Sequence, residues 1–214
     1  RWLRAIGLMS GTSMDGIDAA MIETDGDTVF AFGPTATVDY PADFRERLRA
    51  LMGRQSDRSV QSQAVARELT VRHAEAVLGL LGRAGMDAES VDLIGFHGQT
   101  VFHAPERGIT CQIGDGQLLA AETGIAVVGD FRSADVAAGG EGAPLVPVYH
   151  AALSRTLERP TALLNIGGVA NVTWISPDGG VLAFDTGPGG ALIDDWAARH
   201  GNRPFDADGG LARA

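Results

Sequence analysis

The sequence predicts an α/β fold with a mostly parallel central sheet. Apolar stretches of strand length alternate with helical patterns in the order βββαβαβα over residues 1–159, which is typical of one complete α/β domain. A strand, a glycine turn and a second strand recur from Pro160 onward, which indicates a domain duplication. Residues 160–214 are too few for a second copy of that size, so we expect only the beginning of a second domain there.

The first domain is expected to begin with a β-hairpin formed by residues 5–22. Asp15 and Gly16 close its turn, because glycine tolerates the positive φ of a tight hairpin and aspartate bonds to its own backbone. A third strand follows at residues 28–38. The later elements are expected to be helices at 42–54 and 61–83, a strand at 91–96, a helix at 116–123, a strand at 125–131, a helix at 147–156, a second hairpin at 161–175 and a helix at 191–200. Gly85 is the expected C-terminal cap of the second helix.

Composition and charge restrict the partners of the protein. The net charge of −10 argues against nucleic acid and against anionic membranes, because both bind basic surfaces. Cys111 is the only cysteine, so no disulfide can form within the chain and a reducing compartment is expected. No apolar run reaches the length of a membrane span, and no signal sequence follows Arg1. We therefore expect a cytoplasmic protein.

The turn of the first hairpin carries an unusual set of small polar residues. Backbone N–H groups and two hydroxyls would converge on one point, which suits a phosphate chain, and they come from Gly11, Thr12, Ser13 and Gly16. The carboxylates of Asp15 and Asp18 suit magnesium, directly or through water. The alternative is a structural turn of small polar residues without a ligand.

Seven motifs follow one another along the chain. They are GLMSGTSMDGID at 7–18, GFHGQT at 95–100, QIGDG at 112–116, VGDFR at 128–132, GGEGAPL at 139–145, LNIGGVAN at 164–171 and FDTGPG at 184–189. In this order they resemble the anhydro-N-acetylmuramic acid kinases, a bacterial family of the sugar kinase, Hsp70 and actin superfamily. The resemblance covers nearly the whole chain. Members of this family are much longer, so the chain resembles their N-terminal part.

The resemblance implies an actin-like, ribonuclease H-like ATPase fold, in which two similar domains hold a nucleotide and their hairpin turns approach its phosphates from opposite sides. The residues implied in binding ATP are Gly11, Thr12, Ser13, Met14, Asp15, Gly16, Ile17, Asp18, Asn165, Gly167, Gly168 and Asn171. Leu8 replaces the carboxylate that the superfamily usually carries in the first strand, so either Asp15 or Asp18 would hold Mg²⁺ in its place, or phosphate and water alone would hold the ion. The alternative for Gly167 and Gly168 is a β-bulge or close backbone packing.

Asp185 is the general base that the resemblance implies. It follows the apolar run 181–184, so we expect it at a strand end, where the chain turns toward the last helix. A carboxylate can accept a proton from water or a hydroxyl in an electropositive site. The alternatives are a turn former or helix cap, and an aspartic protease motif, which would need a second such loop that the sequence lacks. Gly190 stands where the family normally has asparagine.

A glycine-rich polar loop at residues 132–144 is not expected to pack a core, so it is either mobile or part of a ligand site. The resemblance implies a wall of the sugar pocket. The residues implied in substrate binding are His97, Gln99, Arg132, Asp135, Glu141 and Gly187. Glu141 stands where glutamine is expected, which puts a charge in place of a neutral amide. A zinc site at His97, His103 and Cys111 is disfavoured, because their spacing matches no ligand pair and no fourth ligand is evident.

The function implied by the resemblance is an ATP-dependent kinase in peptidoglycan recycling. It would hydrolyse the 1,6-anhydro bond of 1,6-anhydro-N-acetylmuramic acid and phosphorylate O6, with ATP and Mg²⁺ as cofactors. Its partners would be the sugar and ATP, without nucleic acid or membrane. Whether it forms a homodimer is left undecided by the sequence. An alternative of another class is a truncated chain that binds sugar or phosphate without turnover. A third, a superfamily kinase for short carboxylic acids, is disfavoured by the specific motifs.

Overall fold

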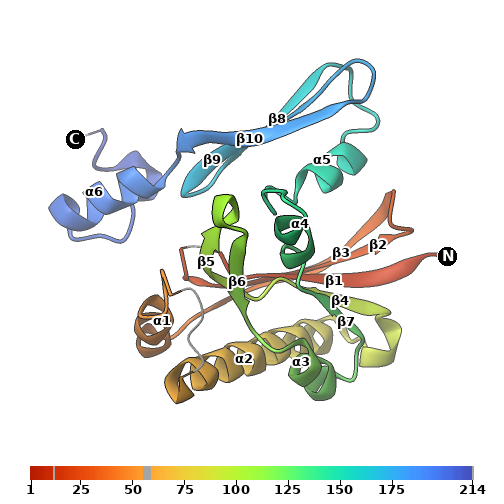
Figure 1. Ribbon diagram of the computed structural model, residues 1–214, viewed down its shortest axis with the longest axis horizontal. Helices are drawn as coiled ribbons and strands as arrows, with labels where there is room; N and C mark the ends of the chain where they lie inside the picture. Colours follow the sequence, from red (N-terminus) through yellow and green to blue (C-terminus); the bar gives the residue numbers. More distant parts are fainter. Residues whose placement is uncertain (12, 55–58, 214) are drawn as a thin grey trace. The chain divides into compact units, whose positions relative to one another are not determined.

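The computed structural model describes residues 1–11, 13–54 and 59–213 (Figure 1). The chain divides into two units, Arg1–Ala143 and Pro144–Ala214. The sequence prediction places a domain boundary after residue 159 instead, and that division of the protein into domains stays a prediction. Each unit is described by itself below.

The first unit is built on a five-stranded sheet. Its strands are β1 (Leu3–Met9), β2 (Gly16–Thr24), β3 (Val29–Asp39), β4 (Leu93–Phe96) and β7 (Val127–Gly129), in the order β3-β2-β1-β4-β7. β4 pairs in parallel with β1 and β7, whereas β2 pairs antiparallel with β1 and β3. The predicted α/β class is confirmed. The sheet is mixed rather than mostly parallel, because the short turns after β1 and β2 allow only antiparallel neighbours.

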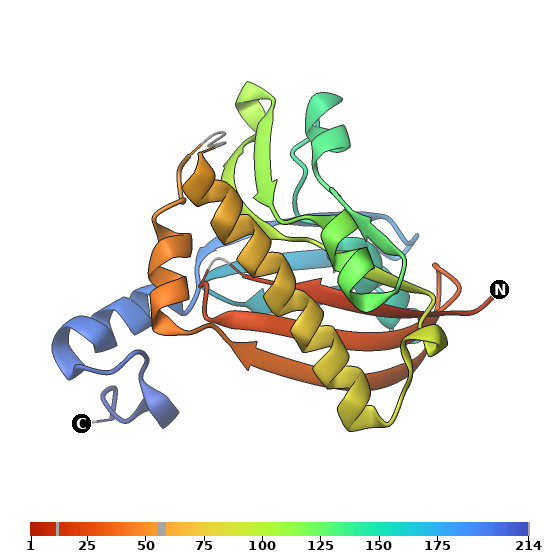
Figure 2. The ribbon, with the colours of Figure 1, turned by 90° about the horizontal axis from the view of Figure 1, so that it is seen from below.

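Three helices cover one face of this sheet: α1 (Ala42–Arg49), α2 (Val60–Ala84) and α3 (Gly116–Thr123) (Figure 1). Viewed from below, α2 crosses the strands diagonally (Figure 2). Ile6, Ile17 and Ile94 are fully buried in the same apolar cluster as Leu69 and Leu80 of α2. The period of two along the strands and of 3.6 along the helix thus builds one core beneath the sheet.

Local hydrogen bonds define the ends of α2 and α3. The Ser59 side chain accepts from the Ser62 N–H at 3.1 Å at the start of α2, and Gly85 ends that helix in the left-handed conformation at φ 64°. The Asp115 carboxylate accepts from the N–H groups of Gln117 and Leu118 at the start of α3. The predicted cap at Gly85 and the predicted bounds of α3 are confirmed.

Parts of the first unit differ from the prediction. Strands β5 (Gln99–Ala104) and β6 (Ile109–Ile113) form a separate two-stranded sheet that sequence reasoning missed. Helix α1 ends at Arg49 rather than at residue 54. Helix α4 (Ser133–Ala137) forms inside the glycine-rich loop and buries Val136, so the expectation that this loop packs no core is wrong. The short 3-10 helices are η1 (Ala88–Ser90) and η2 (Pro105–Arg107).

The second unit contains α5 (Pro147–Leu153), β8 (Thr161–Ile166), β9 (Val169–Ile175), β10 (Val181–Pro188), α6 (Ala191–Gly201) and η3 (Ala207–Gly209). Its strands form an antiparallel sheet in the order β10-β9-β8, so the predicted second hairpin is confirmed. Strand β10 continues past Asp185 to Pro188, and the expectation that Asp185 lies at a strand end is wrong. None of the described helices is long and apolar enough to cross a membrane.

One face of the second sheet is apolar and exposed. Its large exposed side chains are Leu164, Ile166, Trp174, Leu182 and Phe184. On the opposite face Thr173 and Ile175 are buried, and the Thr173 hydroxyl oxygen lies 2.8 Å from Nδ1 of His150 in α5. Alternation along the strands therefore gives this sheet one face packed against α5 and one face of exposed apolar side chains.

His73 of α2 is a fully buried polar residue in the core of the first unit. Its Nδ1 bonds to the Leu69 carbonyl oxygen at 2.8 Å, and its ring packs edge-on against Phe96 with the centroids 5.0 Å apart. Its Nε2 has no hydrogen-bond partner among the described residues. Burial lowers the pKa of His73 to about 4, so the imidazole is neutral at neutral pH.

We expect the first unit to lose stability as the pH falls from about 7 to about 4. The unfolded chain binds a proton on His73 near pH 6.5 and the folded chain only near pH 4, so acid favours unfolding between these values. The loss from this residue should be about 3 kcal/mol at the acid end. Hydrogen exchange of the α2 amides should show a smaller acid loss in His73→Gln than in the wild type. Equal losses would contradict the assignment.

Candidate functional site

The turn between β1 and β2 is held within itself and by β3. The Met14 N–H donates to the Gly11 carbonyl at 3.1 Å, and Met14 takes the left-handed conformation at φ 53°. Gly16 has no positive φ, so the predicted reason for a glycine there is wrong. A Cβ at Gly16 would collide with the carbonyl oxygen of Val38, which shows that close packing of β2 on β3 requires the glycine. Thr12, also predicted to bind phosphate, lies outside the described residues.

A buried chain of hydrogen bonds anchors this turn. The Tyr40 hydroxyl donates to Ser10 Oγ at 2.9 Å, and the Ser10 hydroxyl donates to Gln99 Oε1 at 2.6 Å. The Gln99 amide nitrogen donates to the carbonyl oxygens of Gly11 and Thr100, both at 3.3 Å. Tyr40, Ser10 and Gln99 are only 5%, 2% and 0% exposed, so the chain runs through the interior.

Gln99 therefore contacts the turn instead of presenting its amide at the surface. Its oxygen accepts from Ser10 and its nitrogen points at two carbonyl oxygens, so both ends of the amide are used within the chain. This geometry supports a role in positioning the turn, and sugar binding by Gln99 stays a prediction. Sequence reasoning missed Ser10 and Tyr40 as site residues. The sequence feature that could have pointed to Tyr40 was its place, as a polar aromatic residue, at the end of the third strand.

The turn offers only some of its groups to a ligand. The side chains of Met14 and Ile17 are buried in the core cluster, so only their backbone could take part in nucleotide binding. The Met14 N–H is already bonded to Gly11. Ser13 is exposed and Gly11 is partly exposed. The accessible part of the turn is therefore its first half together with the carboxylates that follow.

Asp15 and Asp18 each have one carboxylate oxygen bonded to a hydroxyl. Ser13 Oγ donates to Asp15 Oδ1 at 2.8 Å, and Thr37 Oγ1 donates to Asp18 Oδ1 at 2.7 Å. Within the described residues, no group of three or more His, Cys, Asp or Glu side chains could hold a metal. A magnesium ion at this turn would need phosphate and water oxygens to complete its shell. Metal binding by these two residues stays a prediction.

A second polar cluster joins His97 to the segment after β7. Arg132 Nε donates to His97 Nε2 at 3.0 Å, and His97 Nδ1 lies 2.9 Å from the Gly98 carbonyl oxygen. Arg132 also donates to the Gly142 carbonyl, and the Gly142 N–H donates to Asp135 Oδ2 at 2.7 Å. The structure thus brings together three of the residues predicted for the sugar pocket.

These hydrogen bonds define His97 as a neutral imidazole. A carbonyl oxygen can only accept, so Nδ1 carries the proton and Nε2 is free to accept from Arg132. Burial lowers the pKa of His97, and the positive guanidinium of Arg132 lowers it further. Glu141 is exposed on the loop that this cluster closes. The pair of His97 and Arg132 therefore carries one positive charge, on the guanidinium.

In the second unit, the predicted catalytic aspartate lies in a row with two asparagines. Asn165 of β8 pairs with Asn171 of β9, which pairs with Asp185 of β10. Directly opposed residues of antiparallel neighbours point to the same face of a sheet. Strand pairing therefore gathers three side chains from two motifs into one polar row, and Asp185 is exposed in it.

The glycine turn between β8 and β9 is tied to the beginning of α6. The N–H groups of Gly189 and Gly190 donate to the carbonyl oxygens of Gly168 and Gly167 at 2.9 and 2.8 Å. A Cβ at Gly189 would collide with the Gly167 carbonyl oxygen, so the two segments pack backbone against backbone. Gly187 has a φ of 138°, which favours glycine, beside a register shift in β10. The turn and Asp185 are thus held in one unit.

Known proteins resemble this chain along nearly all of its length. The family model described as anhydro-N-acetylmuramic acid kinase matches residues 3–214. A protein of that name from Paramagnetospirillum magneticum is 58% identical over 210 residues, and one from Rhodospirillum rubrum is 57% identical over 212 residues. Both alignments cover 98% of this chain but 58% and 56% of the relatives. The chain thus spans little more than half the length of these relatives.

Similarity to solved structures is weaker. The Ppx/GppA family member from Aquifex aeolicus is 8% identical, with a TM-score of 0.40, over 91% of this chain and 54% of that chain. The ethanolamine utilization protein EutJ from Carboxydothermus hydrogenoformans is 16% identical, with a TM-score of 0.38, over 97% of this chain and 59% of that chain. Similarities of this size carry no conclusion about the present chain.

Gly16→Ala should destabilise the first unit, whereas Gly11→Ala should not. A methyl group at Gly16 meets the backbone of β3, so the free energy of unfolding should fall by about 1–3 kcal/mol. At Gly11 the nearest atom to the added methyl is Ser13 Oγ at 3.5 Å, an ordinary contact. Thermal unfolding of both variants beside the wild type measures the contrast. Equal melting temperatures for the two variants would contradict the packing role of Gly16.

Proposed function

The chain belongs to the anhydro-N-acetylmuramic acid kinase family, and we propose that it forms the N-terminal part of an enzyme with that activity. The enzyme uses ATP to hydrolyse the 1,6-anhydro bond of 1,6-anhydro-N-acetylmuramic acid and to phosphorylate O6, a step of peptidoglycan recycling. The observation that carries this proposal is the family match over residues 3–214, with 58% identity to a relative of that name. The proposed activity is that of a protein of the relatives' length, of which this chain spans little more than half.

The turn after β1, together with Gly16 at the start of β2, is the proposed phosphate site of the first unit. With a net charge of −10, the protein has no excess of cationic side chains, so backbone N–H groups and a metal ion must stabilise the phosphates. Gly11 and Ser13 are accessible for this purpose. Asp15 and Asp18 would hold Mg²⁺ together with phosphate oxygens, and the ion neutralises phosphate charge when bound.

The second unit contributes a glycine turn and the proposed general base. Gly167 and Gly168 supply further backbone donors in this proposal, next to the row formed by Asn165, Asn171 and Asp185. The row supports the assignment of Asp185, because an exposed carboxylate beside an amide can be oriented by it and still receive a proton.

The proposed reaction begins with a proton transfer to Asp185. A carboxylate oxygen takes a proton from a water molecule, the water oxygen bonds to the anomeric carbon, and the bond from that carbon to O6 breaks. The electron pair of the broken bond stays on O6. O6 then bonds to the γ-phosphorus of ATP, ADP leaves, and the proton remains on Asp185 until the products are released.

The cluster of His97, Arg132 and Asp135 is the proposed wall of the sugar site. The substrate carries a carboxylate on its lactyl group, and the half-buried guanidinium of Arg132 offers more N–H donors than its two bonds to His97 and Gly142 use. Neutral His97 adds no competing charge beside it. Gly187 and Glu141 belong to the same proposal, with Glu141 as the residue that departs from the family pattern.

A second candidate function is binding of sugar or phosphate without turnover. In the chain taken alone, the apolar face of β8, β9 and β10 is exposed, and contiguous apolar surface of this kind normally has a partner. A chain without that partner would bind a ligand but would not turn it over. The chain also spans only 58% of its relative from Paramagnetospirillum magneticum. Activity measurements on the chain and on a longer protein distinguish the two functions.

Asp185→Asn should lower turnover by roughly a hundredfold or more and leave the fold intact, since it removes the base and keeps the side-chain shape. Turnover is measured as ADP release that depends on the anhydro-sugar, in a protein of the relatives' length. Asp195→Asn is the matched control, because it makes the same change at an exposed position of α6. A variant at Asp185 that keeps more than about a tenth of the wild-type rate would contradict the assignment.

The 214-residue chain by itself should show no measurable kinase activity and should self-associate. The apolar face of its second sheet is the physical reason for association. Sugar-dependent ADP release and light scattering are measured side by side for this chain and for a protein of the relatives' length. The longer protein should turn over the sugar as a defined species. A monodisperse short chain with full activity would contradict this prediction.

A further inference from the structure

Tyr40 contacts both ends of the turn proposed to bind phosphate. Its hydroxyl donates to Ser10 Oγ at 2.9 Å, at the beginning of the turn. Its backbone N–H donates to the carbonyl oxygen of Asp15 at 2.8 Å, at the end of the turn. One residue from the end of β3 therefore bridges the two points where the chain enters and leaves the turn.

The hydrogen bonds from Tyr40 run in one direction only. The Gln99 amide nitrogen points at carbonyl oxygens, so its Oε1 must be the acceptor of the Ser10 hydroxyl hydrogen. Ser10 has only one hydrogen to donate, so its oxygen accepts from Tyr40. Burial raises the pKa of Tyr40 to about 12, so the hydroxyl keeps its proton and remains a donor at neutral pH.

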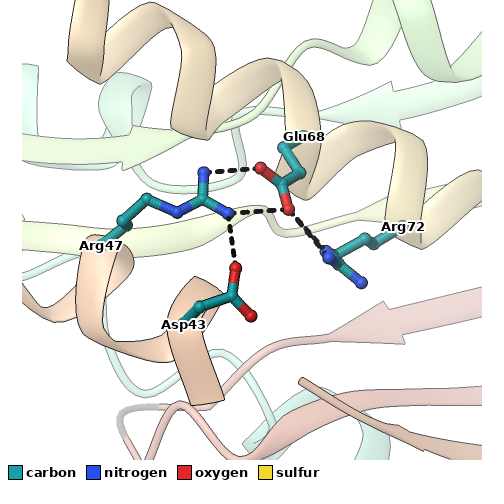
Figure 3. A network of polar contacts seen from close by, with 4 residues as sticks. All are labelled: Asp43, Arg47, Glu68 and Arg72. Carbon is teal, nitrogen blue, oxygen red and sulfur yellow. Dashed lines mark hydrogen bonds and ion pairs between the residues drawn. The ribbon is translucent and has the colours of Figure 1, made fainter. Parts of the chain in front are cut away.

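The ring of Tyr40 is held by the layer formed by α1 and α2. It packs edge-on against Phe44, with the ring centroids 4.9 Å apart, and the Arg72 guanidinium lies 4.8 Å from the Phe44 centroid on α1. Figure 3 shows why Arg72 stays there: the Glu68 carboxylate accepts from Arg72 at 2.8 Å and from Arg47 at 2.6 Å. The ring contact with Phe44 and the hydrogen bond to Ser10 thus restrain the Tyr40 hydroxyl beside the turn.

We propose that Tyr40 is a positioning residue for nucleotide binding: its hydroxyl, acting through Ser10 and Gln99, holds the described part of the turn, residues 10–11 and 13–15, in the shape that accepts phosphate. This inference rests on the proposed function. It assigns to Tyr40, Ser10 and Gln99 a role in ATP affinity without contact to ATP. His97 and Arg132 of the proposed sugar site share none of these hydrogen bonds, and Gln99, which was also predicted for that site, uses both ends of its amide within this chain.

Tyr40→Phe in the full-length protein tests the inference, because it removes one oxygen atom and keeps the ring that packs on Phe44. Calorimetric binding of MgATP and the KM values for ATP and the anhydro-sugar are measured. The Kd and KM for ATP should rise about tenfold, which corresponds to about 1.4 kcal/mol and to one buried hydrogen bond. The KM for the sugar should stay within about twofold, because its proposed site is elsewhere. Tyr149→Phe is the matched control, since it changes the chain's other tyrosine, which lies on α5.

Ser10→Ala breaks the same chain at its second bond and should raise the Kd for ATP to a similar degree. The double variant should bind ATP no more weakly than Ser10→Ala alone, because both changes remove one shared path. Unchanged ATP binding in Tyr40→Phe would overturn the inference, and so would equal losses for ATP and sugar, which a purely structural role predicts. If the wild type binds MgATP but does not phosphorylate the sugar, the proposed function fails, and the ratio of ATP affinities still decides the role of Tyr40.

Discussion

The first turn depends on a buried chain of hydrogen bonds between side chains that are distant in sequence. Tyr40 follows β3, Ser10 follows β1 and Gln99 begins β5. A buried hydroxyl or amide without a hydrogen-bond partner lowers the stability of the fold by about 1–3 kcal/mol. Each of these groups therefore needs the next one in place as its partner. The described residues of the turn, 10–11 and 13–15, are consequently held in place before any ligand binds, so ligand binding spends no free energy on ordering them.

A turn that is already shaped for phosphate matters more in an acidic protein, because few cationic side chains are available to bind ATP. Arg47 and Arg72 of the first unit are bonded to Glu68, and Arg132, which is bonded to His97 and Gly142, is assigned to the sugar in the proposed function. In the proposed function, ATP then depends on backbone N–H groups and a metal ion. Backbone donors cannot reorient as a lysine side chain can, so the shape of the turn must be correct in advance.

The second unit shows how strand pairing divides apolar and polar roles. Asn165, Asn171 and Asp185 lie on one face of its sheet, which also packs against α5. Leu164 and Phe184, one residue away along their strands, lie on the exposed apolar face. Because side chains alternate with a period of two, the position of Asp185 in β10 determines on which face of the sheet its carboxylate lies and which side chains lie beside it.

The sequence by itself determined the features that depend on neighbours along the chain. The α/β class, the two hairpins, the bounds of α3 and the cap at Gly85 follow from local periodicity, turn chemistry and capping. The collinear motifs also identified the right family, because the order of motifs along the chain can be seen in the sequence without any tertiary contact. The prediction that Gly16 closes the turn through a positive φ is wrong, because Gly16 is the first residue of β2 and has no positive φ.

Only the tertiary structure decided what depends on residues brought together from afar. Four contacts join separate elements in this way. Gly16 packs on β3, Gln99 and Tyr40 bond to residues of the first turn, and Asp185 pairs with Asn171. The hairpin of β5 and β6 was missed for a related reason, since its strands mix polar and apolar residues: β5 buries the polar Gln99 beside Val101 and Ala104, and every residue of β6 is only partly buried. Local patterns act over a few residues, whereas such contacts form only when packing and the need to pair buried polar groups select one arrangement of the whole unit.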